Sequence, residues 1–267
     1  KFSVQCKNIF EQIKRDVIGQ QDVVEGAVIA MIAGGNVLLE GVPGLAKTLA
    51  MNRVPVLGIN LGSLGFMSEL EPNELERLRD LKSWDFAVES RMMLDVSVLR
   101  GGKSVYNNIA LNDAVISKGS IARVVRLNIF TEEGFLTRVG GDGVVLATPT
   151  GSTGYSMAAG GPIVEPSARN LLITPICAHA MLTKTIVVSP ERVISVRIGK
   201  IGRHNAYLSV DGGRAFRLNT GDVITTKLSQ KVTKLVRLKQ TSFFEILNKK
   251  FIFLLCFPHF TIRTDAL

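Results

Sequence analysis

The middle of the chain carries the run Gly141-Asp142-Gly143-Val144-Val145-Leu146-Ala147-Thr148-Pro149-Thr150-Gly151-Ser152-Thr153-Gly154-Tyr155-Ser156. Its apolar part, from Val144 to Ala147, predicts a short strand. The part that follows, from Thr150 to Ser156, offers hydroxyl groups, exposed backbone N–H groups and one aromatic face. That set is suited to hydrogen-bonding and stacking a nucleotide. The alternative is a plain turn rich in small residues.

The sequence on both sides of this run is mostly typical of strands. Apolar and polar residues alternate from Phe86 to Val98, which predicts a long strand with one buried face, and Gly101-Gly102 closes it as a hairpin. Further strand-like runs occupy residues 121–130, 185–188, 193–198, 206–210 and 223–226. We therefore expect a β-rich lobe over residues 85–235.

The first part of the chain has an α/β pattern. Helical periodicity is followed by a short strand and by the loop Gly41-Val42-Pro43-Gly44-Leu45-Ala46-Lys47-Thr48. Glycines let backbone N–H groups wrap a phosphate, so we expect Gly41, Gly44, Lys47 and Thr48 to bind one, with Thr48 able to hold Mg²⁺. Residues 4–51 resemble the start of a MoxR-type AAA+ ATPase. The chain shows neither the acidic pair nor the arginine finger of such an ATPase, and a truncated loop that binds an anion is the alternative.

The charge balance and the cysteines limit the partners and the compartment. Lys and Arg number 32 and Asp and Glu 23, a net charge of +9, which attracts anions such as nucleotides, polyphosphate or nucleic acid; a merely soluble basic surface gives the same balance. Three scattered cysteines without a CxxC pair predict a reducing compartment, the cytoplasm, and no metal site. The run at residues 251–257 is far shorter than the roughly 20 residues of a membrane helix, so no membrane span is expected.

Several segments, in the right order along residues 55–250, resemble the NAD kinase family. They are Pro55-Val56-Leu57-Gly58-Ile59-Asn60-Leu61-Gly62-Ser63-Leu64-Gly65-Phe66, Asn112-Asp113, the run from Gly141 to Ser156, Ala159-Gly160-Gly161-Pro162 and Thr174-Pro175-Ile176-Cys177-Ala178-His179. The resemblance implies a kinase that phosphorylates NAD to NADP with ATP or polyphosphate as donor and Mg²⁺. It also implies a homo-oligomer, a dimer or tetramer, with no nucleic-acid partner.

The candidate substrate residues suit a dinucleotide. An amide beside a carboxylate, Asn112-Asp113, can read an adenine edge and grip ribose hydroxyls, although the pair alone would equally form a turn at a strand end. The resemblance places Asp142 near the nicotinamide end, and a lone His179 is more often structural than catalytic. The full set that it implies for NAD is Asn112, Asp113, Arg123, Asp142, Thr150, Thr153, Gly154, Tyr155, Ser156 and Ala158.

The chain departs from the family before Pro55. NAD kinases carry Gly-Gly-Asp-Gly-Thr there, and its Asp is taken as the general base on the adenosine 2′-hydroxyl. This chain has no such motif at that place, and Gly140-Gly141-Asp142-Gly143 corresponds to the later, substrate-contacting segment. We therefore assign no catalytic residue, and interpret residues 1–53 as an ATPase beginning joined to a kinase that has lost its first half.

The predicted fold class is α/β plus β-rich. It is an NAD-kinase-like two-domain fold with an incomplete or replaced N-terminal α/β lobe. The expected parts are 1–53, a P-loop fragment; 54–84, a remnant of the kinase first lobe; 85–235, the NAD-binding lobe; and 236–267, a segment that returns to the first lobe and an unrecognised tail. Three functions remain open: NAD kinase, with catalysis in question, an inactive NAD- or NADP-binding module, and a P-loop ATPase fragment.

Overall fold

The structure is a computed structural model that describes residues 55–60, 66–83, 86–119, 123–178, 184–200, 205–239 and 241–255, and the side chains of these residues up to 249. The predicted phosphate loop (Gly41, Gly44, Lys47 and Thr48) and His179 lie outside these residues. The described chain forms two compact units. One holds residues 55–56 and Ser90–Lys234, and the other holds Leu57–Glu89 and residues 235–255.

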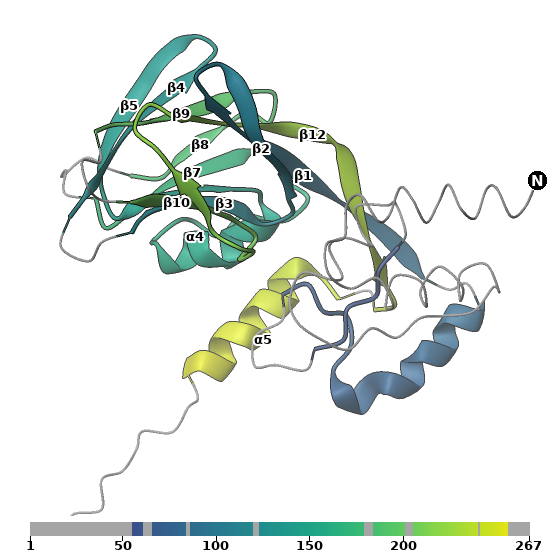
Figure 1. Ribbon diagram of the computed structural model, residues 1–267. Coiled ribbons are helices and arrows are strands. Elements are labelled where there is room, and N and C mark those ends of the chain that lie inside the picture. The colour runs from purple at the N-terminus through teal and green to yellow at the C-terminus, as the bar shows by residue number, and fades with distance from the viewer. Residues whose placement is uncertain are drawn as a thin grey trace, which may run out of the picture. The chain divides into compact units, whose positions relative to one another are not determined.

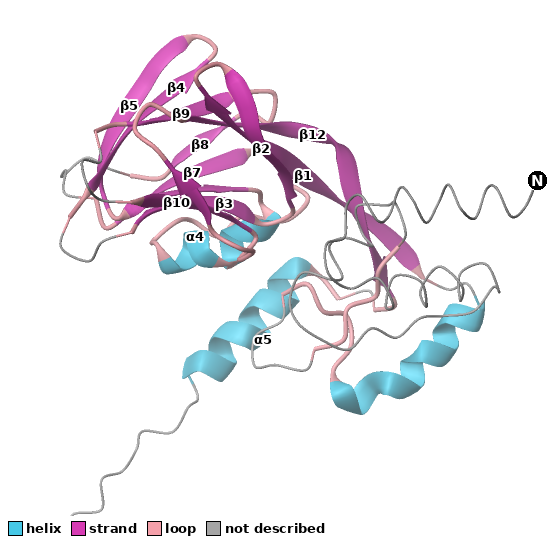
Figure 2. Cartoon of the chain, viewed as in Figure 1, coloured by secondary structure: helices cyan, strands magenta, loops and turns pink. Residues whose placement is uncertain are grey.

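The first unit is built on two six-stranded sheets (Figures 1 and 2). Every strand pair with a recorded register is antiparallel. The first sheet has the order β2 (Lys103–Ala110), β1 (Ala87–Arg100), β12 (Val223–Arg237), β9 (Ile194–Ile198), β4 (Val125–Thr131) and β5 (Gly134–Gly141). The second has the order β11 (Phe216–Leu218), β10 (Ala206–Val210), β3 (Asp113–Lys118), β6 (Gly143–Ala147), β7 (Leu171–Ile176) and β8 (Ile186–Val188). The expected β-rich lobe is therefore present.

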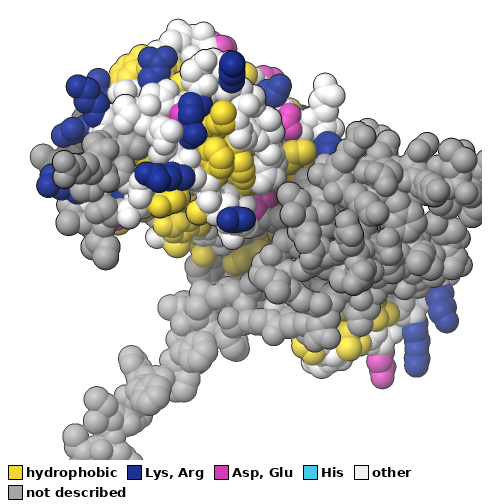
Figure 3. Space-filling view, viewed as in Figure 1, with side chains coloured by type: hydrophobic (Ala, Val, Ile, Leu, Met, Phe, Trp, Pro, Cys, Tyr) yellow, Lys and Arg dark blue, Asp and Glu magenta, His cyan; other side chains and the backbone are white. Residues whose placement is uncertain are grey.

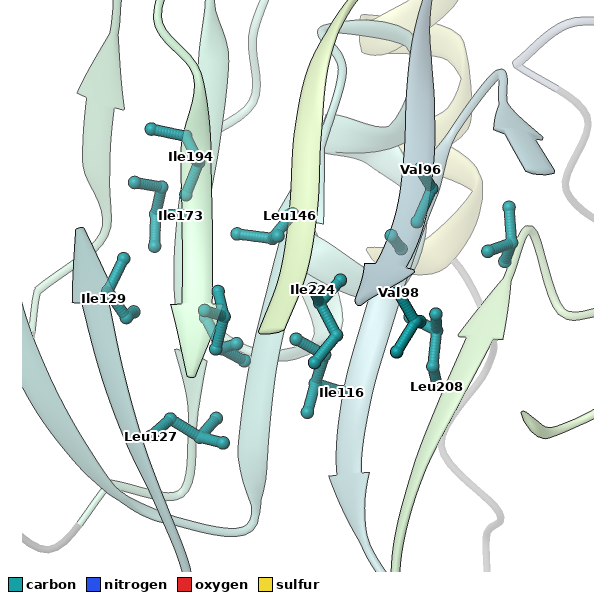
Figure 4. Packing of buried hydrophobic residues seen from close by; sticks show 14 of the residues in the cluster. Val96, Val98, Ile116, Leu127, Ile129, Leu146, Ile173, Ile194, Leu208 and Ile224 are labelled. Carbon is teal, nitrogen blue, oxygen red and sulfur yellow. The ribbon is translucent and has the colours of Figure 1, made fainter. Parts of the chain in front are cut away.

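The core of this unit is formed by alternate residues of both sheets. Each strand turns successive side chains to opposite faces, so one set from each sheet meets the set from the other (Figure 4). Burying each Val, Leu or Ile side chain stabilises the fold by about 1.5–3 kcal/mol. The labelled members of this cluster are Val96, Val98, Ile116, Leu127, Ile129, Leu146, Ile173, Ile194, Leu208 and Ile224.

The glycine pair after β1 forms the predicted hairpin. Gly101 and Gly102 have φ values of 57° and 79°, and Arg100 pairs with Lys103 on β2. Positive φ at both central residues is the requirement of the two-residue turn whose twist matches antiparallel strands. The hairpin is confirmed, whereas the alternation predicted from Phe86 to Val98 holds only from Leu94 to Val98, because residues 91–94 are all buried and Val88 is 45% exposed.

Strand β6 is buried on both faces and positions the segment that follows it. Val144 and Leu146 belong to the core between the sheets. Val145 and Ala147 belong to a second apolar cluster with Val115, Leu172 and Ile176, and Ala159 and Val164 pack against it. The chain after β6 therefore covers the outer face of the second sheet, through a short 3₁₀ turn η2 (Thr150–Thr153) and the one-turn helix α4 (Tyr155–Ala158).

The second unit contains little regular structure among its described residues. Its elements are the 3₁₀ helix η1 (Pro72–Ser83), the helix α5 (Phe243–Leu255) and an isolated bridge between Ile59 and Leu70. Glu69 ties the end of β12 to this unit, because its carboxylate accepts hydrogen bonds from the Arg237 guanidinium (3.0 Å) and from the backbone of Leu238 (2.9 Å) and Lys239 (2.6 Å). An α/β lobe is not visible in the described residues.

Two expectations for this unit need correction: Pro72 followed by Leu75, Leu78 and Leu81 predicts a helix with one apolar face, and the family resemblance implies that the last segment is anchored by Phe243, Phe244, Ile246 and Leu247. The predicted helix at Pro72 is a 3₁₀ helix without a buried residue, and Leu75 on its expected apolar face is 45% exposed. At the start of α5, Ser242 and Glu245 exchange hydrogen bonds as a capping box. Of the expected apolar anchors on α5, Phe243, Ile246 and Leu247 are half-buried, whereas Phe244 is 58% exposed and its ring meets that of Phe243 edge-on.

Candidate functional site

Two predicted site segments meet at the end of β6. The backbone N–H of Thr148 donates to the carbonyl oxygen of Asn112 (2.8 Å). The Thr148 hydroxyl is fully buried, donates to the carbonyl oxygen of Leu111 (2.6 Å) and accepts from the N–H of Gly151 (3.1 Å). This single residue therefore fixes the loop after β6 against the Asn112–Asp113 segment.

Gly151 brings the two segments into direct backbone contact. A Cβ atom built on Gly151 would lie 2.1 Å from the carbonyl oxygen of Asn112, a separation that no side chain can occupy. Only glycine allows so close an approach of one backbone to another. The small residues of the predicted turn are thus required by packing as well as by chain reversal.

The carboxylate of Asp113 lies beside the loop after β6. Asp113 is the first residue of β3 and is only 6% exposed, and its Oδ2 atom lies 3.9 Å from the position of a Cβ built on Gly154. Asn112, next to it, is half-buried. The structure therefore brings the amide–acid pair and the hydroxyl-rich loop together, as the sequence predicted.

The loop divides into an accessible face and a buried support. Gly154, Tyr155 and Ala158 are exposed, with Tyr155 46% exposed, and Thr153 is half-buried. Ser156 is fully buried, and its hydroxyl makes a 2.8 Å hydrogen bond with the hydroxyl of Thr174 on β7. The aromatic face of Tyr155 is available to a ligand, whereas the Ser156 hydroxyl is engaged inside the protein.

Arg91 was missed by the sequence pattern. It falls on the polar side of the alternation in β1, which predicts a solvated side chain, yet it is 3% exposed. Its Nη1 atom donates to the Thr150 hydroxyl (3.3 Å), and Thr150 is itself 5% exposed. The buried guanidinium of Arg91 thus supports the loop after β6 through its hydrogen bond to Thr150. Four successive buried residues, from Arg91 to Leu94, interrupt the expected alternation.

Asp142 and Arg123 lie at the other end of the β3–β6 pair. Asp113 pairs with Ala147 and Ser117 pairs with Gly143, so Asp142, one residue beyond Gly143, is five residues along the ladder from Ala147, or about 17 Å. The Asp142 carboxylate forms an ion pair with Lys118 (2.5 Å). Exposed Arg123 precedes Val125, which pairs with Gly141. The structure therefore divides the predicted residues into two groups.

Asp211, which follows strand β10, is a further residue at the junction. Both of its carboxylate oxygens accept backbone N–H bonds: Oδ2 from Leu111 (2.7 Å) and Oδ1 from Asn112 (2.7 Å) and Asp113 (2.9 Å). An Asp-Gly pair after a strand is a turn signal. Because the contact joins residues about a hundred positions apart, no local pattern predicts it.

The surface of the described residues is basic, and no metal cluster is found in it. On the face drawn in Figure 3, Lys and Arg side chains are spread over the β-rich unit and acidic ones are few, in keeping with the net charge of +9. Within the described ranges, no three His, Cys, Asp or Glu side chains gather in a way that could hold a metal ion. No helix in this part of the chain is long and apolar enough to cross a membrane.

The described chain thus contains an antiparallel sandwich with an amide–acid pair beside a hydroxyl-rich loop, and comparison with known proteins identifies the family of such a domain. The family profile of the ATP-NAD kinase C-terminal domain matches residues 111–238, which include Asn112, the loop after β6 and Asp211. The NAD kinase of Acetivibrio thermocellus is 36% identical over 89% of this chain and 81% of its own, and that of Natranaerobius thermophilus is 38% identical over 89% and 80%. The chain belongs to the NAD kinase family of phosphotransferases.

Solved structures agree with this assignment. A crystal structure of yeast NADH kinase complexed with NADH superimposes with a TM-score of 0.67 at 30% identity, over 79% of this chain and 61% of the yeast chain. An NAD kinase from Archaeoglobus fulgidus in complex with ATP gives a TM-score of 0.63 at 25% identity, over 88% and 95%. The predicted NAD-kinase-like fold is thus confirmed for the β-rich part.

The matched range also bears on the first 53 residues. Residues 1–53 make up a fifth of the sequence, whereas each of the two bacterial relatives matches 89% of this chain. The matched range therefore includes part of residues 1–53, and the similarity to NAD kinases extends into them. The interpretation of this segment as the start of a MoxR-type ATPase, joined to a kinase, gains no support from these comparisons and stays a prediction.

Proposed function

We propose that this chain binds NAD and transfers a phosphoryl group from ATP or polyphosphate to the 2′-hydroxyl of the adenosine ribose, giving NADP. The observation that carries the proposal is the junction of the Asn112–Asp113 segment with the loop after β6, in a member of the NAD kinase family. A carboxylate and an amide beside hydroxyl groups supply the hydrogen bonds that adenine and ribose require. The relatives solved with NADH and with ATP support this choice of ligands.

The residues that we propose for NAD form two groups. Asn112 and Asp113 hold the adenosine, and Tyr155 offers its exposed ring for stacking. Asp142 and Arg123, about 17 Å away along the β3–β6 ladder, hold the nicotinamide end. The other residues that we propose for the NAD site belong to the segment after β6 itself: Thr150, Thr153, Gly154, Ser156 and Ala158.

The phosphoryl donor is assigned to the part of the chain outside the described residues. Gly41, Gly44, Lys47 and Thr48 are the proposed phosphate-binding residues, and Mg²⁺ would accompany the donor and screen its phosphates there.

The missing Gly-Gly-Asp-Gly-Thr motif before Pro55 favours a second candidate, a module that binds NAD or NADP without catalysis. The two candidates share the NAD site and differ in the group that would deprotonate the 2′-hydroxyl. An assay of NADP formation with ATP, and separately with polyphosphate, decides between them when it is combined with calorimetry of NAD binding.

Three outcomes are informative. NADP formation that Asp113→Ala abolishes supports the kinase. NAD binding without turnover supports the inactive module. Absence of NAD and NADP binding contradicts both, and ATP hydrolysis that is abolished by Lys47→Ala and indifferent to Asp113→Ala would then support a P-loop ATPase.

The proposal extends to assembly and location. A homo-oligomer, dimer or tetramer, in the cytoplasm is expected from the family resemblance and the cysteine pattern. Light scattering on the purified chain measures the assembly, and a monomer at micromolar concentration would contradict that part of the proposal.

A further inference from the structure

The backbone of the amide–acid pair is held almost entirely by one residue. Asp211 Oδ1 accepts the N–H groups of Asn112 and Asp113, and the N–H of Asp211 donates to the carbonyl oxygen of Asp113 (2.9 Å). The remaining backbone polar group, the carbonyl oxygen of Asn112, accepts from Thr148. Three of the four backbone polar groups of the pair therefore depend on Asp211.

The geometry of Asp211 is unusual for a residue in a simple turn. Its φ is +50°, in the left-handed region that non-glycine residues rarely adopt, and it is followed by Gly212 with φ of +71°. Asp tolerates this region better than most residues, but the conformation persists only where the surroundings hold it. Here it aims the carboxylate at three successive N–H groups, from Leu111 to Asp113. Successive backbone N–H groups of this kind form a concave site for an anion.

We propose that Asp211 is a positioning residue for dinucleotide recognition, which acts by fixing the backbone from which Asn112 and Asp113 present their side chains. The inference rests on the proposed function, because it takes Asn112 and Asp113 as the groups that hold the adenosine. Asp211 is not placed in contact with the ligand. It sets the angle at which the amide and the carboxylate meet the ligand, and a displacement of about 1 Å in positioning groups can cost ~100-fold in reaction rate.

The Asp211→Asn variant is the sharpest test. It keeps the size of the side chain but retains one acceptor oxygen, so at least one of the three N–H groups then faces an NH₂ group. We expect the dissociation constant for NAD, measured by calorimetry on the full chain, to rise by at least about tenfold, with the affinity for ATP unchanged.

Asp222→Asn is the matched control. Asp222 is also a turn carboxylate, 1% exposed, that accepts a backbone N–H from Asn219 (2.8 Å) and pairs with Arg100, but it contacts neither site segment. If Asp211 were only structural, both variants would lower the melting temperature and neither would change the affinity of the folded fraction for NAD. That result would overturn the inference.

A double variant separates this inference from the proposed function. If Asp211 acts in part through Asp113, the loss of NAD affinity caused by Asp211→Asn is smaller in the Asp113→Ala background than in the unmodified chain, and additive losses would contradict the proposal. If the unmodified chain binds no NAD, the proposed function fails. If it binds NAD and Asp113→Ala weakens binding while Asp211→Asn does not, only the role of Asp211 fails.

Discussion

Gly151 and Asn112 touch through their backbones: a Cβ atom on Gly151 would lie 2.1 Å from the carbonyl oxygen of Asn112. The same carbonyl oxygen accepts the N–H of Thr148. The contact joins the end of β6 to the start of β3, and the proposed site depends on it.

The Gly151→Ala variant should therefore separate the two segments. The methyl group must displace backbone atoms, an overpacking that costs about 1–3 kcal/mol, and the Thr148–Asn112 hydrogen bond should weaken with it. Urea denaturation measures the loss. Gly140→Ala is the control, because a Cβ on Gly140 meets nothing within 4 Å. Equal stability of the two variants would show that the backbones of Gly151 and Asn112 can move apart without a cost in unfolding free energy.

The buried hydroxyl of Thr148 should be needed as well. Thr148→Val keeps the shape of the side chain but leaves the carbonyl oxygen of Leu111 and the N–H of Gly151 without this partner. Leaving buried polar groups unsatisfied costs about 1–3 kcal/mol in the free energy of unfolding. Thr148→Ser retains the hydroxyl and should lose less stability than Thr148→Val. The reverse order would mean that the methyl group matters more than the hydrogen bonds.

Ser156 is expected to serve stability and not ligand contact. Its hydroxyl is fully buried and is bonded to Thr174, so Ser156→Ala should cost about 1 kcal/mol of unfolding free energy. The dissociation constant for NAD should stay unchanged, whereas Tyr155→Ala, which removes an exposed ring, should weaken NAD binding. Calorimetry on both variants tests this contrast, and a loss of affinity in Ser156→Ala would restore Ser156 as a contact.

The Arg100–Asp222 pair should give the fold an acid-sensitive component. Burial raises the pKa of Asp222, but hydrogen bonds from Arg100 and from the Asn219 N–H outweigh it, so the pKa lies below the ordinary 3.8. A lowered pKa in the folded state contributes stability above the unfolded pKa, and this is lost as pH falls through the folded pKa.

Asp222→Asn should therefore destabilise the protein at neutral pH, and the difference from the unmodified chain should shrink below about pH 4. Glu132→Gln is the comparison, because the pKa of Glu132 is also lowered, mainly by Arg192, but the pair is exposed and contributes little. Denaturant titrations from pH 2 to 7 measure both. A pH-independent difference for Asp222→Asn would contradict the assignment.

The sequence predicted the strands whose patterns are local. β1 follows from an alternation that the structure keeps from Leu94 to Val98, the hairpin follows from its glycine pair, and the apolar run of β6 predicts a strand. β2 was missed because it is a largely exposed edge strand with adjacent polar residues, Asn107 and Asn108, and no alternation. β7 was missed because Pro175 argues against a strand. The structure accommodates it, since β8 pairs only with residues 171–173 and leaves Pro175 outside that ladder.

The sequence predicts which residues form the candidate site, but it does not predict the buried side chains, Arg91 and Asp211, that hold these residues in place. The amide–acid pair and the hydroxyl-rich loop were found because each is a continuous segment. The burial of Arg91 and the role of Asp211 depend on which strands become neighbours, and the pairing of Val210 with Ala114 is set by the whole sandwich. Spacing within a segment carries no information on such pairings.

The distance along the chain between Asp211 and the segment that it holds also bears on synthesis. These partners are separated by 98 to 100 residues, and contacts of such long range form late because a large loop must close first. A nascent chain that has not yet extended past Val210 lacks the carboxylate that orders Asn112 and Asp113. Incomplete translation products should therefore be unable to sequester the cellular pool of dinucleotide.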